Sequence, residues 1–141
     1  RMVWVGDGPS VRQLASEGQD HHFAGTRLGE DLAAHYASAD LFLFPSLTET
    51  YGNVVAEAMA SGLPVLAFRS AAAAELIRDG VDGLTVSPGD ENAYVAGALE
   101  IAASPDRLAE IGRSARQAML PRNWGRVVAS FEAVASEVLA R

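Results

Sequence analysis

The sequence predicts an α/β fold in which helices cover a parallel β-sheet on both faces. Short apolar runs alternate with longer alanine-rich segments of helical spacing along the 141 residues. Runs such as MVWV and LFLF are apolar at successive positions, which is typical of strands buried on both faces. Glycine, proline or serine separates most of these segments. Alternating strands and helices of this kind form parallel sheets with right-handed crossovers.

Each element can be placed from its pattern and its flanking residues. Pro45 ends the LFLF strand, and Gly62 follows the end of the next helix. We expect strands over residues 2–6, 22–25, 41–44, 64–68 and 83–86. We expect helices over residues 11–16, 30–38, 53–60, 71–78, 91–103, 105–119 and 124–139.

Composition excludes several classes of function. The chain has eleven arginines and eighteen acidic residues, and the resulting net charge of −7 argues against a nucleic-acid partner. The chain has no lysine, so a P-loop lysine and a Schiff-base lysine are excluded. It also has no cysteine, which excludes disulfides and cysteine-bound zinc and permits a reducing compartment. No apolar run approaches the roughly 20 residues of a membrane span.

Two other patterns lead to no site. His21 and His22 are adjacent, so in a strand they point to opposite faces and cannot bind one ion together. We therefore expect no metal. Gly6 and Gly8 begin a dinucleotide-binding pattern, but Val11 stands where its third glycine belongs, so we expect only a tight turn there.

The loop over residues 46–52 is the most informative segment. Ligands bind to parallel sheets on the loops that follow the strands, and this loop leads directly into a helix. A helix start offers unpaired amides and a partial positive charge, which suit a phosphate or diphosphate. Gly52 has no Cβ and lets a ligand approach the backbone closely.

Two glutamates flank this helix start. Taken singly, Glu49 is an ordinary loop carboxylate, and Glu57 is the one solvent-facing position of an apolar helix. Together with Gly52 they suit a ligand that has both a diphosphate and hydroxyl groups, because carboxylates accept hydrogen bonds from diols. Such a ligand is a sugar nucleotide.

Residues 45–65 resemble the signature of retaining glycosyltransferases of the GT-B fold, in which seven residues separate two glutamates. The family pattern is close to PSxxExFGxxxxEAMAxGxPV, and this chain differs mildly by having Tyr51 in place of the commoner Phe. The resemblance extends from the first residues to about Asp90. It implies that residues 1–141 form a Rossmann-like nucleotide-sugar-binding domain, the C-terminal half of such an enzyme, with residues 124–141 as its last helix.

The resemblance also implies roles for individual residues. Glu49 would act at the catalytic centre by touching the transferred sugar near the reacting carbon, and Glu57 would bind the donor ribose. The remaining expected donor-binding residues are Tyr51, Gly52, Asn53, Val54, Phe23 and Gly25, the last two near the base. The donor is a nucleoside diphosphate sugar, and the family pattern implies no further cofactor.

The chain departs from the family in two places. The family's glycine pair is replaced by the alanines at residues 71–74, and Glu75 after them has either a functional or a solvent-facing role. The family's first strand and helix, which carry an arginine and a lysine, have no counterpart, and neither does the acceptor-binding N-terminal domain. The missing strand would be central, so we expect a chain truncated at its N-terminus and an interrupted sheet.

Transfer of a sugar with retention to a glycolipid, polysaccharide or small molecule is the leading hypothesis. An epimerase-like or phosphorylase-like enzyme of the same fold, a non-catalytic sugar-nucleotide-binding module and a glycosidase using Glu49 and Glu57 are the alternatives. A cytoplasmic location is expected. Contact with a membrane surface, for which Arg107, Arg113 and Arg116 are the candidates, and homo-oligomerisation are open partner hypotheses.

Overall fold

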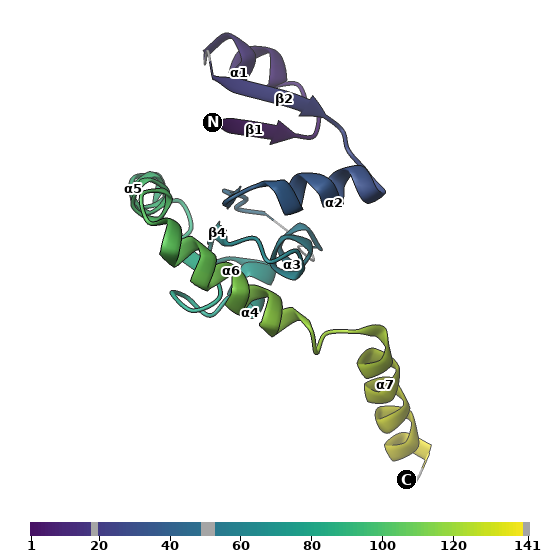
Figure 1. The fold of residues 1–141 in the computed structure, drawn as a ribbon. Helices are drawn as coiled ribbons and strands as arrows, with labels where there is room; N and C mark the ends of the chain where they lie inside the picture. Colours follow the sequence, from purple (N-terminus) through teal and green to yellow (C-terminus); the bar gives the residue numbers. More distant parts are fainter. Residues whose placement is uncertain (18–19, 49–52, 140–141) are drawn as a thin grey trace. The chain divides into compact units, whose positions relative to one another are not determined.

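The computed structural model describes residues 1–17, 20–48 and 53–139, and it confirms the α/β class (Figure 1). The chain divides into two compact units, Arg1–His35 and Tyr36–Arg141, which are described separately. The first contains β1 (Met2–Val5), α1 (Val11–Glu17), β2 (His21–Gly25) and most of α2 (Gly29–Ser38). The second contains β3 (Phe42–Phe44), α3 (Asn53–Ala60), β4 (Val65–Phe68), α4 (Ala71–Leu76), β5 (Leu84–Val86), α5 (Glu91–Ala102), α6 (Pro105–Met119) and α7 (Trp124–Leu139).

The predicted elements all form, and most of their ends are within one residue of the expected ones. Helix α4 is the exception, because it ends at Leu76 rather than at residue 78. Ile77 leaves the helix with extended backbone angles and buries its side chain. The next amide, that of Arg78, donates to the carboxylate of Asp82 instead of continuing the helix.

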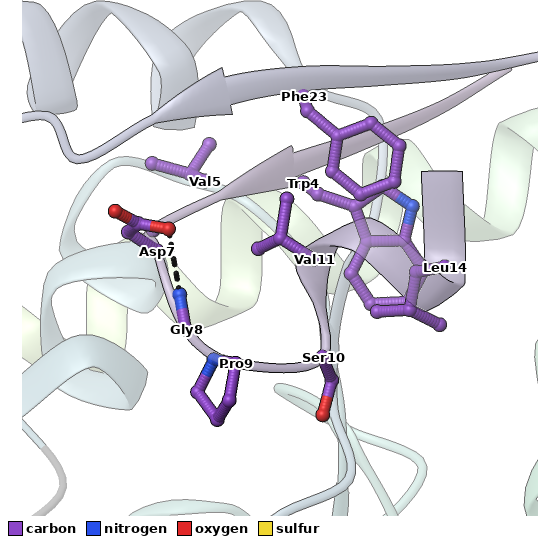
Figure 2. Close-up of a pocket in the computed structure, with 10 residues that line it drawn as sticks. Trp4, Val5, Asp7, Gly8, Pro9, Ser10, Val11, Leu14 and Phe23 are labelled. Carbon is purple, nitrogen blue, oxygen red and sulfur yellow. Dashed lines mark hydrogen bonds between the residues drawn. The ribbon is translucent and has the colours of Figure 1, made fainter. Parts of the chain in front are cut away.

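In the first unit, β1 pairs in parallel with β2. Trp4 and Phe23 stack with their ring centroids 6.1 Å apart, on the side of the sheet where Leu14 of α1 also lies (Figure 2). On the opposite side, Val3 and Val5 are 47% and 41% exposed. The prediction that residues 2–6 form a strand buried on both faces is therefore wrong within this unit, because α1 covers one face of the pair and leaves the other open.

In the second unit, β4 lies between β3 and β5 in a parallel sheet, and all four of its residues are buried. Leu66 and Phe68 pack against Tyr94 of α5. The Tyr94 hydroxyl donates to the Leu66 carbonyl oxygen at 2.9 Å, and burial raises the pKa of Tyr94 above its ordinary value. Helix α3 contacts both β4 and α6. A fully buried central strand is what the apolar run PVLAF predicts.

Among the described residues, no backbone pairing joins β1 or β2 to β3, β4 or β5. The described strands thus form two separate sheets. None of the described helices combines the length and the apolarity that a bilayer crossing requires.

Candidate functional site

Helix α3 carries the central part of the candidate site on a firmly packed base. Val55, Ala58 and Met59 are completely buried, whereas Asn53 and Glu57 are exposed. Glu57 is the only charged residue in the helix. Apolar residues on one side thus attach the helix to the core and leave its polar residues on the other side.

One buried hydroxyl contacts Glu57. The Tyr36 hydroxyl donates to Oε2 of Glu57 at 3.3 Å. The Tyr36 ring is only 8% exposed and packs edge-on against Phe42, with centroids 5.7 Å apart. Burial, and then the neighbouring Glu57 carboxylate, raise the pKa of Tyr36 to about 12. The hydroxyl therefore keeps its proton at neutral pH and acts as the donor.

The carboxyl end of α3 is held by a glycine cap and by α6. Gly62 has a φ of +78°, which favours glycine, and its amide donates to the Met59 carbonyl oxygen at 3.0 Å. The Leu63 amide donates to Ala58 at 3.0 Å, which completes a Schellman motif. Arg116 of α6 donates from Nη1 to the Ala60 carbonyl oxygen at 2.8 Å. These bonds satisfy carbonyl groups that a helix end leaves free.

The loops that follow β3 and β4 are linked. Ser70 Oγ donates to the Ser46 carbonyl oxygen at 3.3 Å. The alanines at residues 71–74 form the first turns of α4, as their helix propensity predicts, and Glu75 behind them is exposed. The functional interpretation of Glu75 remains a prediction.

The structure brings together three of the predicted donor-binding residues. Asn53, Val54 and Glu57 lie on the first two turns of α3. Glu49, Tyr51 and Gly52 lie outside the described residues.

Phe23 and Gly25 belong to the first unit. There Gly25 has a φ of +72°, and its carbonyl oxygen accepts from the Gly6 amide at 2.9 Å. Phe23 lines a cavity of about 220 Å³ with Trp4 and the loop over residues 6–10 (Figure 2). An aromatic wall of this kind suits a flat apolar group.

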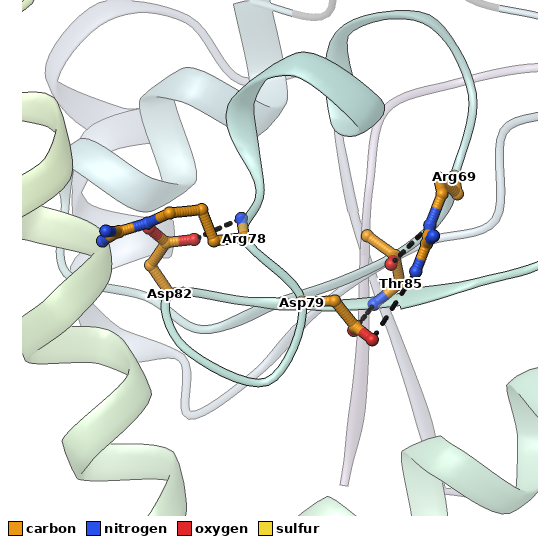
Figure 3. A network of polar contacts seen from close by, with 5 residues as sticks. All are labelled: Arg69, Arg78, Asp79, Asp82 and Thr85. Carbon is orange, nitrogen blue, oxygen red and sulfur yellow. Dashed lines mark hydrogen bonds and ion pairs between the residues drawn. The ribbon is translucent and has the colours of Figure 1, made fainter.

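In a second cluster of charged residues, the carboxylates are bound by groups of the same cluster, and the cluster has a structural role (Figure 3). Asp82 is only 1% exposed and accepts from the backbone amide and from Nε of Arg78, both at 2.6 Å. Asp79 accepts from the Thr85 amide at 2.8 Å and pairs with Arg69 at 3.6 Å. In the part of the chain that the structure describes, no group of three or more histidines and acids could hold a metal ion.

Tyr36 lies in the helix predicted over residues 30–38 but is not among the predicted site residues. A signal was present, because a tyrosine on the apolar side of a helix carries a hydroxyl that needs a partner once it is buried. The identity of that partner, 21 residues further along the chain, depends on the tertiary packing around Tyr36 in the second unit.

Known proteins match this chain over most of its length. The sulfoquinovosyl transferase SQD2 of Arabidopsis thaliana is 36% identical over 129 residues, covering 88% of this chain and 25% of that protein. A GDP-mannose-dependent alpha-mannosyltransferase of Corynebacterium glutamicum is 35% identical over 124 residues, covering 88% of this chain and 30% of that protein.

Solved structures match as well. Sucrose-phosphate synthase from Thermosynechococcus elongatus superposes with a TM-score of 0.85 at 27% identity, over 98% of this chain and 38% of that one. Anabaena HepE in complex with UDP-glucose superposes with a TM-score of 0.77 at 26% identity, over 99% of this chain and 40% of that one. The chain therefore spans between 25% and 40% of the lengths of these proteins. Residues 1–104 match the family described as "Glycosyl transferases group 1", and the chain belongs to that family.

Proposed function

We propose that this chain binds a nucleoside diphosphate sugar and forms the donor-binding part of a glycosyltransferase. The observation that carries the proposal is the exposed Glu57 carboxylate on the second turn of a firmly packed helix, in a chain of this family. The names of two similar proteins support the ligand class. HepE was crystallised with UDP-glucose, and the Corynebacterium relative is GDP-mannose-dependent.

The proposed division of labour follows from charge. The amides and the partial positive charge at the start of α3, including Asn53 and Val54, suit the diphosphate. The Glu57 carboxylate suits the vicinal ribose hydroxyls, because it accepts hydrogen bonds and donates none. Glu49 is assigned to the transferred sugar. Catalysis then consists of positioning the donor and stabilising the leaving diphosphate, with retention of configuration as the family resemblance implies.

Binding of nucleotides tests this proposal. We expect uridine, guanosine or adenosine diphosphate to stabilise the folded chain, by about 2.7 kcal/mol at a ligand concentration one hundred times the Kd. Glu57→Gln keeps the shape of the side chain and removes its charge, so it should abolish most of the stabilisation. Thermal unfolding with each diphosphate measures the effect.

Glu91→Gln is a matched control, because Glu91 is also an exposed glutamate near the start of a helix. It should leave the ligand-induced shift intact. If no diphosphate shifts the unfolding of a folded sample, the donor-site proposal fails. Transfer to a glycolipid, polysaccharide or small-molecule acceptor is then tested by product formation in a protein of the full length of the relatives.

A further inference from the structure

We propose that Tyr36 is a positioning residue of the donor site, whose buried hydroxyl holds the Glu57 carboxylate in the orientation that receives the ribose hydroxyls. This inference rests on the proposed function and adds to it a residue outside the signature segment.

The two partners differ in how freely they can move. Tyr36 lies near the end of α2, is 8% exposed and is packed edge-on against Phe42. Its hydroxyl therefore has a position fixed by the core. Glu57 is exposed. Within the described part of the chain, the hydrogen bond that its carboxylate receives comes from Tyr36, at 3.3 Å.

The contact orients the carboxylate without occupying all of its hydrogen-bond acceptor sites. An ionised carboxylate has about four sites at which it can accept a hydrogen bond, and Tyr36 uses one of them on Oε2. Both oxygens keep free sites for a vicinal diol. The direction of the bond is fixed, because a phenol holds its proton at neutral pH and an ionised carboxylate can only accept.

A gain in affinity follows from this arrangement. An exposed glutamate loses rotamer freedom when a ligand binds to it. If Tyr36 already restricts the Glu57 carboxylate in the free protein, the side chain has less conformational entropy left to lose on binding. The ligand then binds more tightly. The gain applies only to ligand groups that contact Glu57, which are the ribose hydroxyls and not the base or the diphosphate.

The test compares ribonucleotides with nucleotides that lack the ribose hydroxyls. Tyr36→Phe keeps the ring and its contact with Phe42 and removes only the hydroxyl. Isothermal titration would give the Kd of UDP, GDP, ADP and their 2′,3′-dideoxy forms for the wild type, Tyr36→Phe, Glu57→Ala and the double variant. Glu57→Ala removes the acceptor altogether, whereas a glutamine could still accept from Tyr36. We expect Tyr36→Phe to weaken the ribonucleotide about fivefold, the worth of one hydrogen bond. The dideoxy forms should not change, and in the Glu57→Ala background neither should the ribonucleotide.

Tyr94→Phe is the matched control, because it removes another buried hydroxyl, whose acceptor is the Leu66 carbonyl oxygen in the core. It should lower the melting temperature without changing the ratio of ribonucleotide to dideoxynucleotide affinity. Equal weakening of both ligand forms by Tyr36→Phe, or the same loss in the Glu57→Ala background, would overturn the inference.

The two levels of proposal fail differently. If the wild type binds none of UDP, GDP and ADP, the proposed function fails, and the inference fails with it. If the wild type binds and Glu57→Gln weakens binding while Tyr36→Phe does not, only the role of Tyr36 is wrong.

Discussion

The two faces of helix α3 differ in burial and polarity. The buried face carries Val55, Ala58 and Met59, none of which is accessible, and it packs against α6 and β4. The other face carries Asn53 and Glu57, both exposed. The first face has no polar side chain to satisfy, and the second has a carboxylate with free acceptor sites.

The difference separates stability from binding. Substitutions on the buried face should change the free energy of unfolding, because they leave cavities or create overlaps. Substitutions on the exposed face should change ligand affinity with little effect on folding, because solvent already surrounds those groups.

Gly112→Ala should cause the largest loss. Gly112 lies on α6, where an added Cβ would overlap the Gly62 carbonyl oxygen at the end of α3 and touch Pro64 Cδ at 3.3 Å. Both contacts are with backbone or ring atoms that cannot rotate away, so α3 and α6 must separate. We expect the free energy of unfolding to fall by about 3 kcal/mol, measured by urea denaturation. Nucleotide affinity should fall as well, because α3 carries the proposed donor site.

Gly97→Ala provides the opposite case. Gly97 lies within α5, and its added Cβ would meet only Leu66 Cδ1 at 4.0 Å, an ordinary contact. Replacing a helical glycine without strain should raise stability by about 0.5–1 kcal/mol. If Gly112→Ala and Gly97→Ala changed the free energy of unfolding equally, the close approach of α3 and α6 would not be the reason that position 112 requires glycine.

Asp82→Asn should have the next largest effect. Asp82 is buried, and its two oxygens accept from the amide and from Nε of Arg78 (Figure 3). An asparagine can accept one of these bonds but turns its NH₂ group toward the other donor. We expect a loss of about 2 kcal/mol in the free energy of unfolding.

Glu57→Gln is the same chemical change on the exposed face of α3. Its effect on unfolding without ligand should stay within about 0.5 kcal/mol, while its effect on nucleotide binding should be large. Chemical denaturation of both variants, with and without UDP, compares the two carboxylates directly. A large stability loss from Glu57→Gln without ligand would show that Glu57 serves the fold.

The sequence predicts the elements well because they depend on local patterns. The ends of α3 follow from the loop before Asn53 and from Gly62 after it, and the burial of β4 follows from its apolar run. Val3 and Val5 show the limit of such patterns. An apolar run predicts a strand, but whether both of its faces are covered depends on the packing of distant elements.

The candidate site is predictable to the same extent. The family resemblance points to Glu57 from a compact sequence pattern, in which spacing along the chain is informative. Tyr36 and Arg116 contact α3 from residues that lie 21 and 56 positions away from their acceptors. Nothing in the local sequence specifies those pairings, because they depend on the tertiary packing of the second unit around α3.

Arg116→Met should cause a small and local loss of stability. It keeps most of the apolar stem and removes the bond from Nη1 to the Ala60 carbonyl oxygen at the end of α3. Because Arg116 is exposed and the Schellman motif at Gly62 still closes the helix, we expect a loss of only about 0.5–1 kcal/mol. Hydrogen exchange should locate the loss in the last turn of α3, whose amides would exchange faster while those of β4 would not. Arg113→Met, at another exposed arginine of α6, should leave exchange in α3 unchanged. Faster exchange spread evenly over α3 and β4 would mean that Arg116 stabilises the whole unit, and the end of α3 would then not be a separate point of attachment.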